Sequence, residues 1–138
     1  MNTTYDEIFQ CFLENCGVDP SRLPTDEEKI YDLIKNAIRY YNAEIDILDA
    51  VGKLSYNDTL EEINVTLDDT RMMLLVYCLK YIYLENQLIE FQEIWSPYQQ
   101  ELGFRNYKDQ VGGRERSLER VRQDILKYLF RIENKDII

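Results

Sequence analysis

The stretch that decides the fold is "LDDTRMMLLVYCLKYIYLENQLIEFQEIW", residues 67–95. It is apolar on nearly every side as far as Leu84 and on one side only from there to Trp95. About 25 residues without a turn residue greatly exceed the length of a usual β-strand. A helix that is apolar all round is typical of the centre of a bundle, where other helices surround it. The stretch therefore predicts an all-α domain built around this segment.

Two helices are expected before this segment. Thr4 and Glu7 form a capping box at the start of the first, and Gly17 supplies a left-handed stop. A second capping box, "TDEE" at residues 25–28, precedes an apolar stripe with a period near 3.6 in residues 30–41. Both patterns favour amphipathic helices that pack on the central one.

The remaining segments are less regular. Residues 42–69 predict a connector, in which "TLEEINV" favours one or two helical turns. Pro97 is expected to kink or end the central helix. No clean period follows until residues 117–132, which carry an apolar row at helical spacing. We therefore expect a single domain over residues 1–138, a small helical bundle of about four main helices. A long irregular arm at residues 96–116 precedes the C-terminal helix, and a tail follows at 132–138.

Charge is distributed unevenly along the chain, which has a formal net charge of −10. Residues 1–69 hold 16 acidic and 5 basic side chains, whereas residues 70–138 hold 10 acidic and 11 basic ones. The acidic excess argues against general nucleic-acid binding, which needs a cationic surface. This division of charge between the two halves would let copies of the protein attract one another in a preferred orientation. Alternatively, it reflects a solvated acidic face.

The composition also excludes several classes of protein. The longest apolar run, residues 72–84, is shorter than a bilayer span, and no apolar leader follows a basic start, so we expect a cytoplasmic protein without a membrane anchor. The chain has no histidine, no phosphate-binding loop and only three cysteines without C-x-x-C spacing. We expect buried cysteines, no metal, no cofactor, no catalytic residues and no enzymatic activity.

Aromatic and basic side chains gather in the expected arm. These residue types are enriched in protein interfaces, and no helical face is predicted to cover them. The alternative is a second small core beneath the loop. The candidate subunit or partner contacts are Trp95, Tyr98, Phe104, Arg105, Tyr107, Lys108, Arg114 and Arg116.

Five segments carry a family resemblance: "TYDEIFQCFLENC", "DEEKIYDLIKNAIRYYN", "LEEIN…LDDTRMMLL", above all "YLENQLIEFQEIWSPYQQELGFRNYKDQ", and a charged terminal helix from "SLERV". With them the sequence resembles the head-tail connector (adaptor) proteins of long-tailed bacteriophages over most of its length. The resemblance implies a structural virion protein made in the host cytoplasm and located in the neck of the particle. About twelve copies would form a ring under the portal protein and extend the DNA channel. The ring would join the capsid to the next neck or tail-completion protein, and double-stranded DNA would pass without sequence-specific binding.

The resemblance also suggests roles for individual residues. Ile137 and Ile138 become candidate portal contacts, unless they belong to a frayed terminus. Asp46, Asp49 and Asp58 are candidates for the channel lining, because carboxylates repel phosphate and let DNA slide. A different function remains open on charge alone. The acidic first half also suits a small intracellular helical regulator, such as an inhibitor that mimics DNA.

Overall fold

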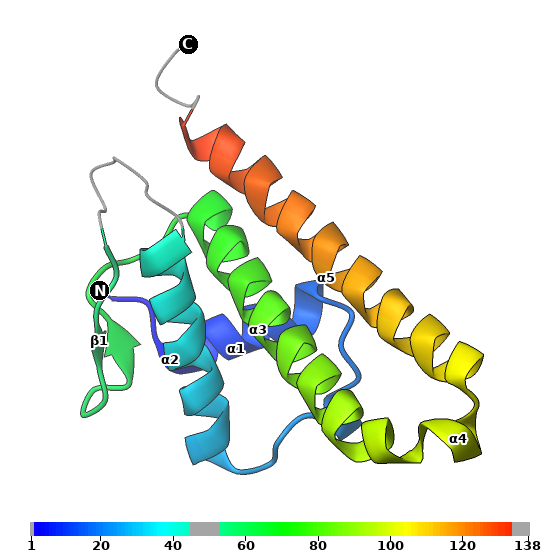
Figure 1. Ribbon diagram of the computed structural model, residues 1–138. Coiled ribbons are helices and arrows are strands. Elements are labelled where there is room, and N and C mark those ends of the chain that lie inside the picture. Colours follow the sequence, from blue (N-terminus) through cyan, green and yellow to red (C-terminus); the bar gives the residue numbers. More distant parts are fainter. Residues whose placement is uncertain (1, 45–52, 134–138) are drawn as a thin grey trace.

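The long helix α3 (Asp69–Trp95) passes through the middle of the molecule and contacts each of the other long helices (Figure 1). The computed structural model describes residues 2–44 and 53–133. The buried side chains of α3 occur on several sides of the helix, which confirms the prediction of a central helix. They are Leu74, Leu75, Val76, Cys78, Leu79 and Tyr83.

Helices form almost all of the regular structure, which confirms the predicted all-α class. In chain order the other elements are α1 (Tyr5–Asn15), η1 (Pro20–Arg22), α2 (Glu27–Glu44), β1 (Tyr56–Asn57), β2 (Glu62–Ile63), η2 (Ser96–Tyr98), α4 (Gln99–Leu102) and α5 (Phe104–Glu133). Helices α1, α2 and α5 all pack against α3. Among the helices of the described residues, none has both the length and the apolar content that a bilayer crossing requires.

The caps of the first two helices differ from each other. The Thr4 hydroxyl accepts from the backbone N–H of Glu7 at 3.2 Å, and Gly17 has φ +62°, as predicted for α1. The predicted cap of α2 at Thr25 is wrong. Because the helix begins at Glu27, Asp26 occupies the capping position, and its carboxylate accepts from the N–H of Glu28 at 3.0 Å.

The connector between α2 and α3 forms a small β-hairpin where helical turns were expected. Strand β1 pairs antiparallel with β2, with Tyr56 opposite Ile63. The Asn57 side chain accepts the backbone N–H groups of Thr59 and Leu60 at 2.9 and 3.1 Å, which closes the turn. An asparagine that satisfies these donors favours the turn over a helix at this place.

The N-terminal segment joins this hairpin and carries the buried polar residue Thr3. The backbone of Thr3 donates to Val65 and accepts from Ile63, each at 2.9 Å. Its hydroxyl accepts the backbone N–H of Leu67, also at 2.9 Å. The side chain therefore satisfies a backbone donor that strand pairing leaves free.

We expect Thr3→Ala to lower the free energy of unfolding by about 1–3 kcal/mol, because it leaves the buried N–H of Leu67 without an acceptor. Thr3→Ser keeps the hydroxyl and should lose clearly less. Urea unfolding followed by far-ultraviolet circular dichroism measures both. Equal losses for the two variants would show that the methyl group, and not the hydrogen bond, carries the effect.

The segment at residues 96–116 is helical, so the expected irregular arm is wrong. Pro97 does end the α-helical part of α3, and η2 and α4 then occupy residues 96–102. Gly103, at φ +92°, reverses the chain, and α5 runs unbroken from Phe104 through both Gly112 and Gly113. The predicted final helix at residues 117–132 is the second part of α5. A glycine inside a helix costs about 1 kcal/mol relative to alanine, and packing on α3 offsets this.

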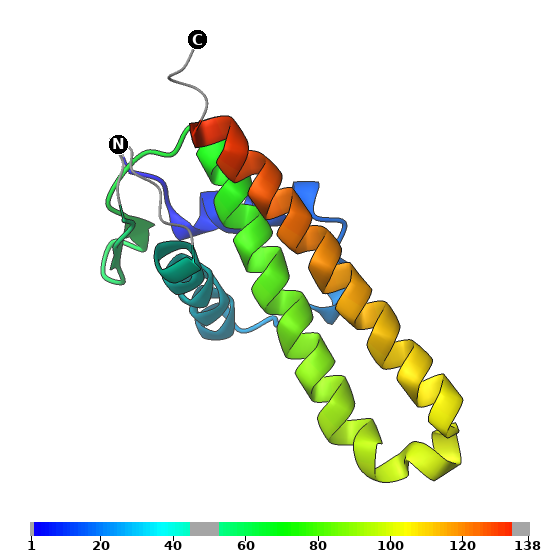
Figure 2. The same ribbon diagram turned by 45° about the horizontal axis from the view of Figure 1, so that its top comes forward.

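The second part of α3 and the first part of α5 run side by side as a two-helix hairpin (Figures 1 and 2). We call residues 86–116 the hairpin arm. It extends beyond the region where α1 and α2 cover α3 (Figure 2). Its side chains are consequently less buried than those of the bundle, and its last turns expose apolar groups.

Candidate protein-interaction site on the hairpin arm

Phe91 lies at the centre of an aromatic cluster that joins the two helices of the arm. The Tyr107 ring from α5 stacks on it, with centroids 5.9 Å apart and 15° between the planes. The Trp95 ring lies 6.5 Å away, and the Arg114 guanidinium carbon lies 4.5 Å from the Phe91 centroid. The fold thus brings together Trp95, Tyr107 and Arg114, three of the predicted contact residues, around a fourth that the sequence did not single out.

Arg114 has a donor that the arm itself leaves unsatisfied. Its Nε is buried and finds no hydrogen-bond partner in the part of the chain that the structure describes. The guanidinium is instead stabilised by the Phe91 ring below it. Arg114 also lines a groove of about 200 Å³ that it shares with Arg22, Ile94 and Trp95. Gln87 and the carboxylate of Glu90 line the same groove, so a polar group of a partner would find both signs of charge beside the Trp95 ring.

The end of the arm exposes large apolar side chains, which we call the tip cluster: Ile94, Trp95, Tyr98 and Phe104. Their exposed fractions are 50, 39, 54 and 57%. Trp95 contacts its own Phe91 and yet keeps a substantial part of its surface in solvent. It therefore anchors to its own hairpin and also contributes to an apolar surface that is open to a partner.

The other predicted basic residues do not join this cluster. Arg105, Lys108 and Arg116 lie on exposed positions of α5. The guanidinium of Arg116 folds back along its helix, so that a methyl group at Gly112 would lie 3.3 Å from one of its nitrogens. Their role as partner contacts stays a prediction, for side chains that are exposed outside the aromatic cluster.

The residues suggested for the portal and channel fall elsewhere. Asp58 is exposed in the β-hairpin turn, where its carboxylate accepts from the Tyr5 hydroxyl at 2.9 Å and contacts the Lys35 amine at 3.4 Å. The other four candidates lie outside the described residues. They are Asp46, Asp49, Ile137 and Ile138.

Several carboxylates converge on the side of the molecule formed by α1, α2 and the β-hairpin. The Tyr31 hydroxyl lies 2.9 Å from a Glu61 oxygen and 3.4 Å from one of Asp6, and it also contacts Glu27. The hydroxyl has one proton and can donate it to one carboxylate at a time. The other carboxylates therefore stay free to accept hydrogen bonds from a partner. The hydrogen bond to Glu27, followed by desolvation, raises the pKa of Tyr31. We call Asp6, Glu27, Glu28, Asp58 and Glu61 the acidic cluster, whose five side chains are all exposed.

The cysteines and the two tyrosines beside the acidic cluster, Tyr5 and Tyr31, have raised pKa values, which predicts a loss of stability at alkaline pH. All three cysteines are free, and Cys16 and Cys78 are buried as expected, whereas Cys11 is half-buried. Burial raises the pKa of Cys16 to about 12, and burial followed by the hydrogen bond to Asp58 raises the pKa of Tyr5. Among the described residues, no group of three cysteine or carboxylate side chains is placed to hold a metal ion.

The unfolded chain has a pKa of 9.0 for a thiol and 10.0 for a tyrosine, and below these values the groups are protonated in both states. Above them the unfolded chain loses its protons before the native protein does, so the stability of the native state falls as pH rises toward the native pKa. We therefore expect the free energy of unfolding to be level from pH 7 to about 8.5 and to fall steadily from about pH 9 to 12. Urea titrations at stepped pH measure it. Tyr5→Phe should flatten the curve above pH 10, and a wild-type curve that stays level would contradict the prediction.

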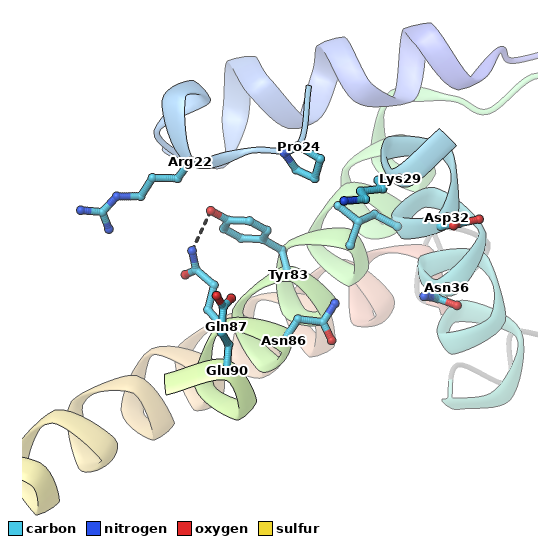
Figure 3. Close-up of a pocket in the computed structure, with 10 residues that line it drawn as sticks. Arg22, Pro24, Lys29, Asp32, Asn36, Tyr83, Asn86, Gln87 and Glu90 are labelled. Atoms are coloured by element: carbon cyan, nitrogen blue, oxygen red, sulfur yellow. Dashed lines mark hydrogen bonds between the residues drawn. The ribbon is translucent and has the colours of Figure 1, made fainter. Parts of the chain in front are cut away.

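A polar cavity of about 340 Å³ lies between α2 and α3 under η1, close to the arm (Figure 3). Arg22 and Lys29 lie to either side of Tyr83 and Glu90 lies below it, while the Tyr83 hydroxyl accepts from the Gln87 amide at 2.7 Å (Figure 3). Mixed charges and amides suit one polar side chain of a partner. The sequence did not reveal this cavity, because it depends on the angle between two helices. The signal in the sequence was the pair of adjacent amides, Asn86 and Gln87, where the central helix becomes apolar on one side only.

These features define a small helical-bundle protein with an exposed two-helix arm. The chain belongs to the YomZ prophage protein family, whose model matches residues 1–134. It is similar to the SPbeta prophage-derived uncharacterized protein YomZ of Bacillus subtilis (strain 168). The two are 30% identical over 116 residues, which cover 84% of this chain and 85% of the relative. No solved structure shows a significant match.

Proposed function

We propose that this protein is a structural component of the virion, a head-tail connector that assembles as a ring under the portal protein. In this role it extends the DNA channel and joins the capsid to the tail or the next neck protein. Membership of a prophage family supports a role in a phage-derived system. The resemblance of its sequence segments to head-tail connectors supports this particular role.

The observation that carries the proposal is the hairpin arm with its tip cluster. An arm two helices wide cannot bury its last turns by itself, which leaves Trp95, Tyr98 and Phe104 partly exposed. Aromatic side chains of this kind, surrounded by arginines, are typical of the energetically important centres of protein interfaces. The arm is also built on helices and needs little ordering when it binds. It suits contact with a portal or a neighbouring subunit.

The acidic cluster supports the channel part of the proposal. Its five carboxylates are exposed and are partly compensated by Lys35 alone among the ion pairs of the described residues. A wall of such groups repels the phosphates of DNA and opposes tight binding during passage. Asp58 belongs to this cluster, which keeps it a candidate for the channel surface.

Binding to the portal protein encoded by the same prophage tests the proposal. Tyr98→Ala/Phe104→Ala removes two exposed rings from the tip, while Leu126→Ala removes an exposed apolar side chain (48%) toward the opposite end of α5. We expect the wild type and Leu126→Ala to sediment with the portal and to form rings in negative-stain images. The tip variant should bind about tenfold more weakly or worse. Absence of wild-type binding, or equal binding by the tip variant, would overturn the proposal.

The acidic cluster also favours a second function, that of a regulator that mimics DNA. Carboxylates from three separate elements form one surface there, which a basic DNA-binding protein of the host would recognise. In that case Glu27→Lys/Glu28→Lys should abolish capture of such proteins, and the tip variant should leave capture unchanged. The opposite pattern, with portal binding lost only in the tip variant, favours the connector.

A further inference from the structure

The side of α5 that faces away from α3 carries a row of basic side chains. Successive members are separated by 11, 4, 7 and 4 residues, spacings that return to one face of a helix. The opposite face of α5 holds the buried Val121, Ile125 and Ile132. We call the following residues the basic row: Arg105, Arg116, Arg120, Lys127 and Arg131.

The charge of the basic row is available to a partner. All five side chains are exposed, and none forms an ion pair with another described residue. Arg131 packs on the Tyr128 ring, with 5.0 Å between the guanidinium carbon and the ring centroid. Asp109 places an acid on the same face of the helix, and Asp124 lies at its edge between Arg120 and Lys127. From Arg105 to Arg131 the row is about 39 Å long at 1.5 Å per residue.

The acidic cluster lies on the other side of the molecule. Both views show α2 and the β-hairpin on one side of α3 and α5 on the other (Figures 1 and 2). The charge imbalance between the two halves of the sequence therefore becomes a separation in space. One side of the bundle presents a basic helix face, and the opposite side presents carboxylates from α1, α2 and the β-hairpin turn.

We infer that copies of this chain associate side by side, with the basic row of one copy against the acidic cluster of the next. Opposite charges on opposite sides make a heterologous contact, which repeats from copy to copy and closes into a ring when the rotation allows it. A protein of net charge −10 otherwise repels its own copies, so the basic row is where a second copy gains most from approach. The inference deepens the proposed ring by naming its lateral contact, and it rests on that proposal. It assigns the acidic cluster to the contact between copies in place of the channel wall.

Charge exchange in the full chain tests this contact, with sedimentation velocity at 50 and 500 mM NaCl as the measurement. The row variant is Arg116→Glu/Arg120→Glu, and the cluster variant is Glu28→Lys/Glu61→Lys. We expect the wild type to associate at low salt and to dissociate at high salt, because screening weakens exposed charge pairs. Each variant alone should associate about tenfold more weakly or worse. An equimolar mixture should recover association, because the reversed row then meets the reversed cluster.

A matched pair of single substitutions separates position from net charge. Arg120→Glu changes a member of the row, whereas Arg122→Glu makes the same change of charge at an exposed position of α5 outside it. Only Arg120→Glu should weaken association, and circular dichroism confirms that both remain folded. A monomeric wild type at 50 mM NaCl, equal effects of the two variants, or a mixture that fails to recover would each overturn the inference.

Two further outcomes are distinguishable. If the basic row serves double-stranded DNA instead, a duplex will shift with the wild type and not with Arg116→Glu/Arg120→Glu, and the charge-exchange mixture will not recover association. If rings form on the portal, but the row and cluster variants self-associate as well as the wild type, the connector proposal stands and the lateral contact is overturned. Recovered self-association without portal binding supports the contact and contradicts the connector.

Discussion

Replacing Phe12 by alanine is expected to lower the free energy of unfolding by about 3–5 kcal/mol. Phe12 is fully buried, and its ring lies 6.1 Å from that of Tyr83 on the central helix, at an edge-to-face angle of 73°. Alanine would remove the transfer free energy of the ring and leave a cavity where α1 meets α3. A domain of this size is stable by only about 5–15 kcal/mol, so this single change removes a large part of the total.

Phe9→Ala provides the matched control for Phe12→Ala on the same helix. Phe9 is only half-buried, and its ring lies 6.1 Å from that of Phe12. We expect its loss to be less than half as large, because less apolar surface leaves the solvent. Urea unfolding followed by far-ultraviolet circular dichroism measures both variants. Equal losses, or a loss below about 1.5 kcal/mol for Phe12→Ala, would show that α1 contributes little to the core.

The second large effect is expected in the hairpin arm, where Phe91→Ala should lower the free energy of unfolding by about 2–3 kcal/mol. The Phe91 ring supports Tyr107 by stacking and Arg114 by a cation–π contact. Without it, α5 loses its main attachment to α3 in this part of the arm. Amide hydrogen exchange in residues 104–113 should therefore become faster by more than that of the bundle.

Phe104→Ala is the matched control for the arm. Phe104 is 57% exposed at the tip, so its loss should change stability by less than about 0.5 kcal/mol. Hydrogen exchange in residues 104–113 should stay close to that of the wild type. If the two variants accelerate exchange equally, the Phe91 cluster does not hold the arm together. If Phe91→Ala accelerates hydrogen exchange equally in the arm and in the bundle, the arm is not a separate cooperative unit.

Much of the fold was predictable from local patterns. The apolar stretch at residues 67–95 identified the central helix, and Thr4 with Gly17 marked both ends of α1. These signals are short-range: a cap requires one side chain near one amide, and a helix that is apolar all round requires burial wherever it lies. The all-α class followed from them.

The candidate site was predicted only in part. The sequence identified Trp95, Tyr107 and Arg114, because aromatic and arginine side chains gather in one segment. It missed Phe91, which lies at their centre, because Phe91 appeared to be an ordinary member of an apolar stripe. It also missed the polar cavity between α2 and α3, whose walls come from residues far apart in the chain.

The sequence by itself determined which segments are helical by strong periodicity, where proline ends α3, and how charge is divided between the two halves of the chain. Only the tertiary structure decided that residues 104–116 are helical despite Gly112-Gly113, and that the acidic and basic groups face opposite sides of α3. The physical reason is the range of the interactions. Capping and periodicity act within a few residues, whereas the packing of α5 on α3 joins segments tens of residues apart and outweighs the weak local preference of two glycines.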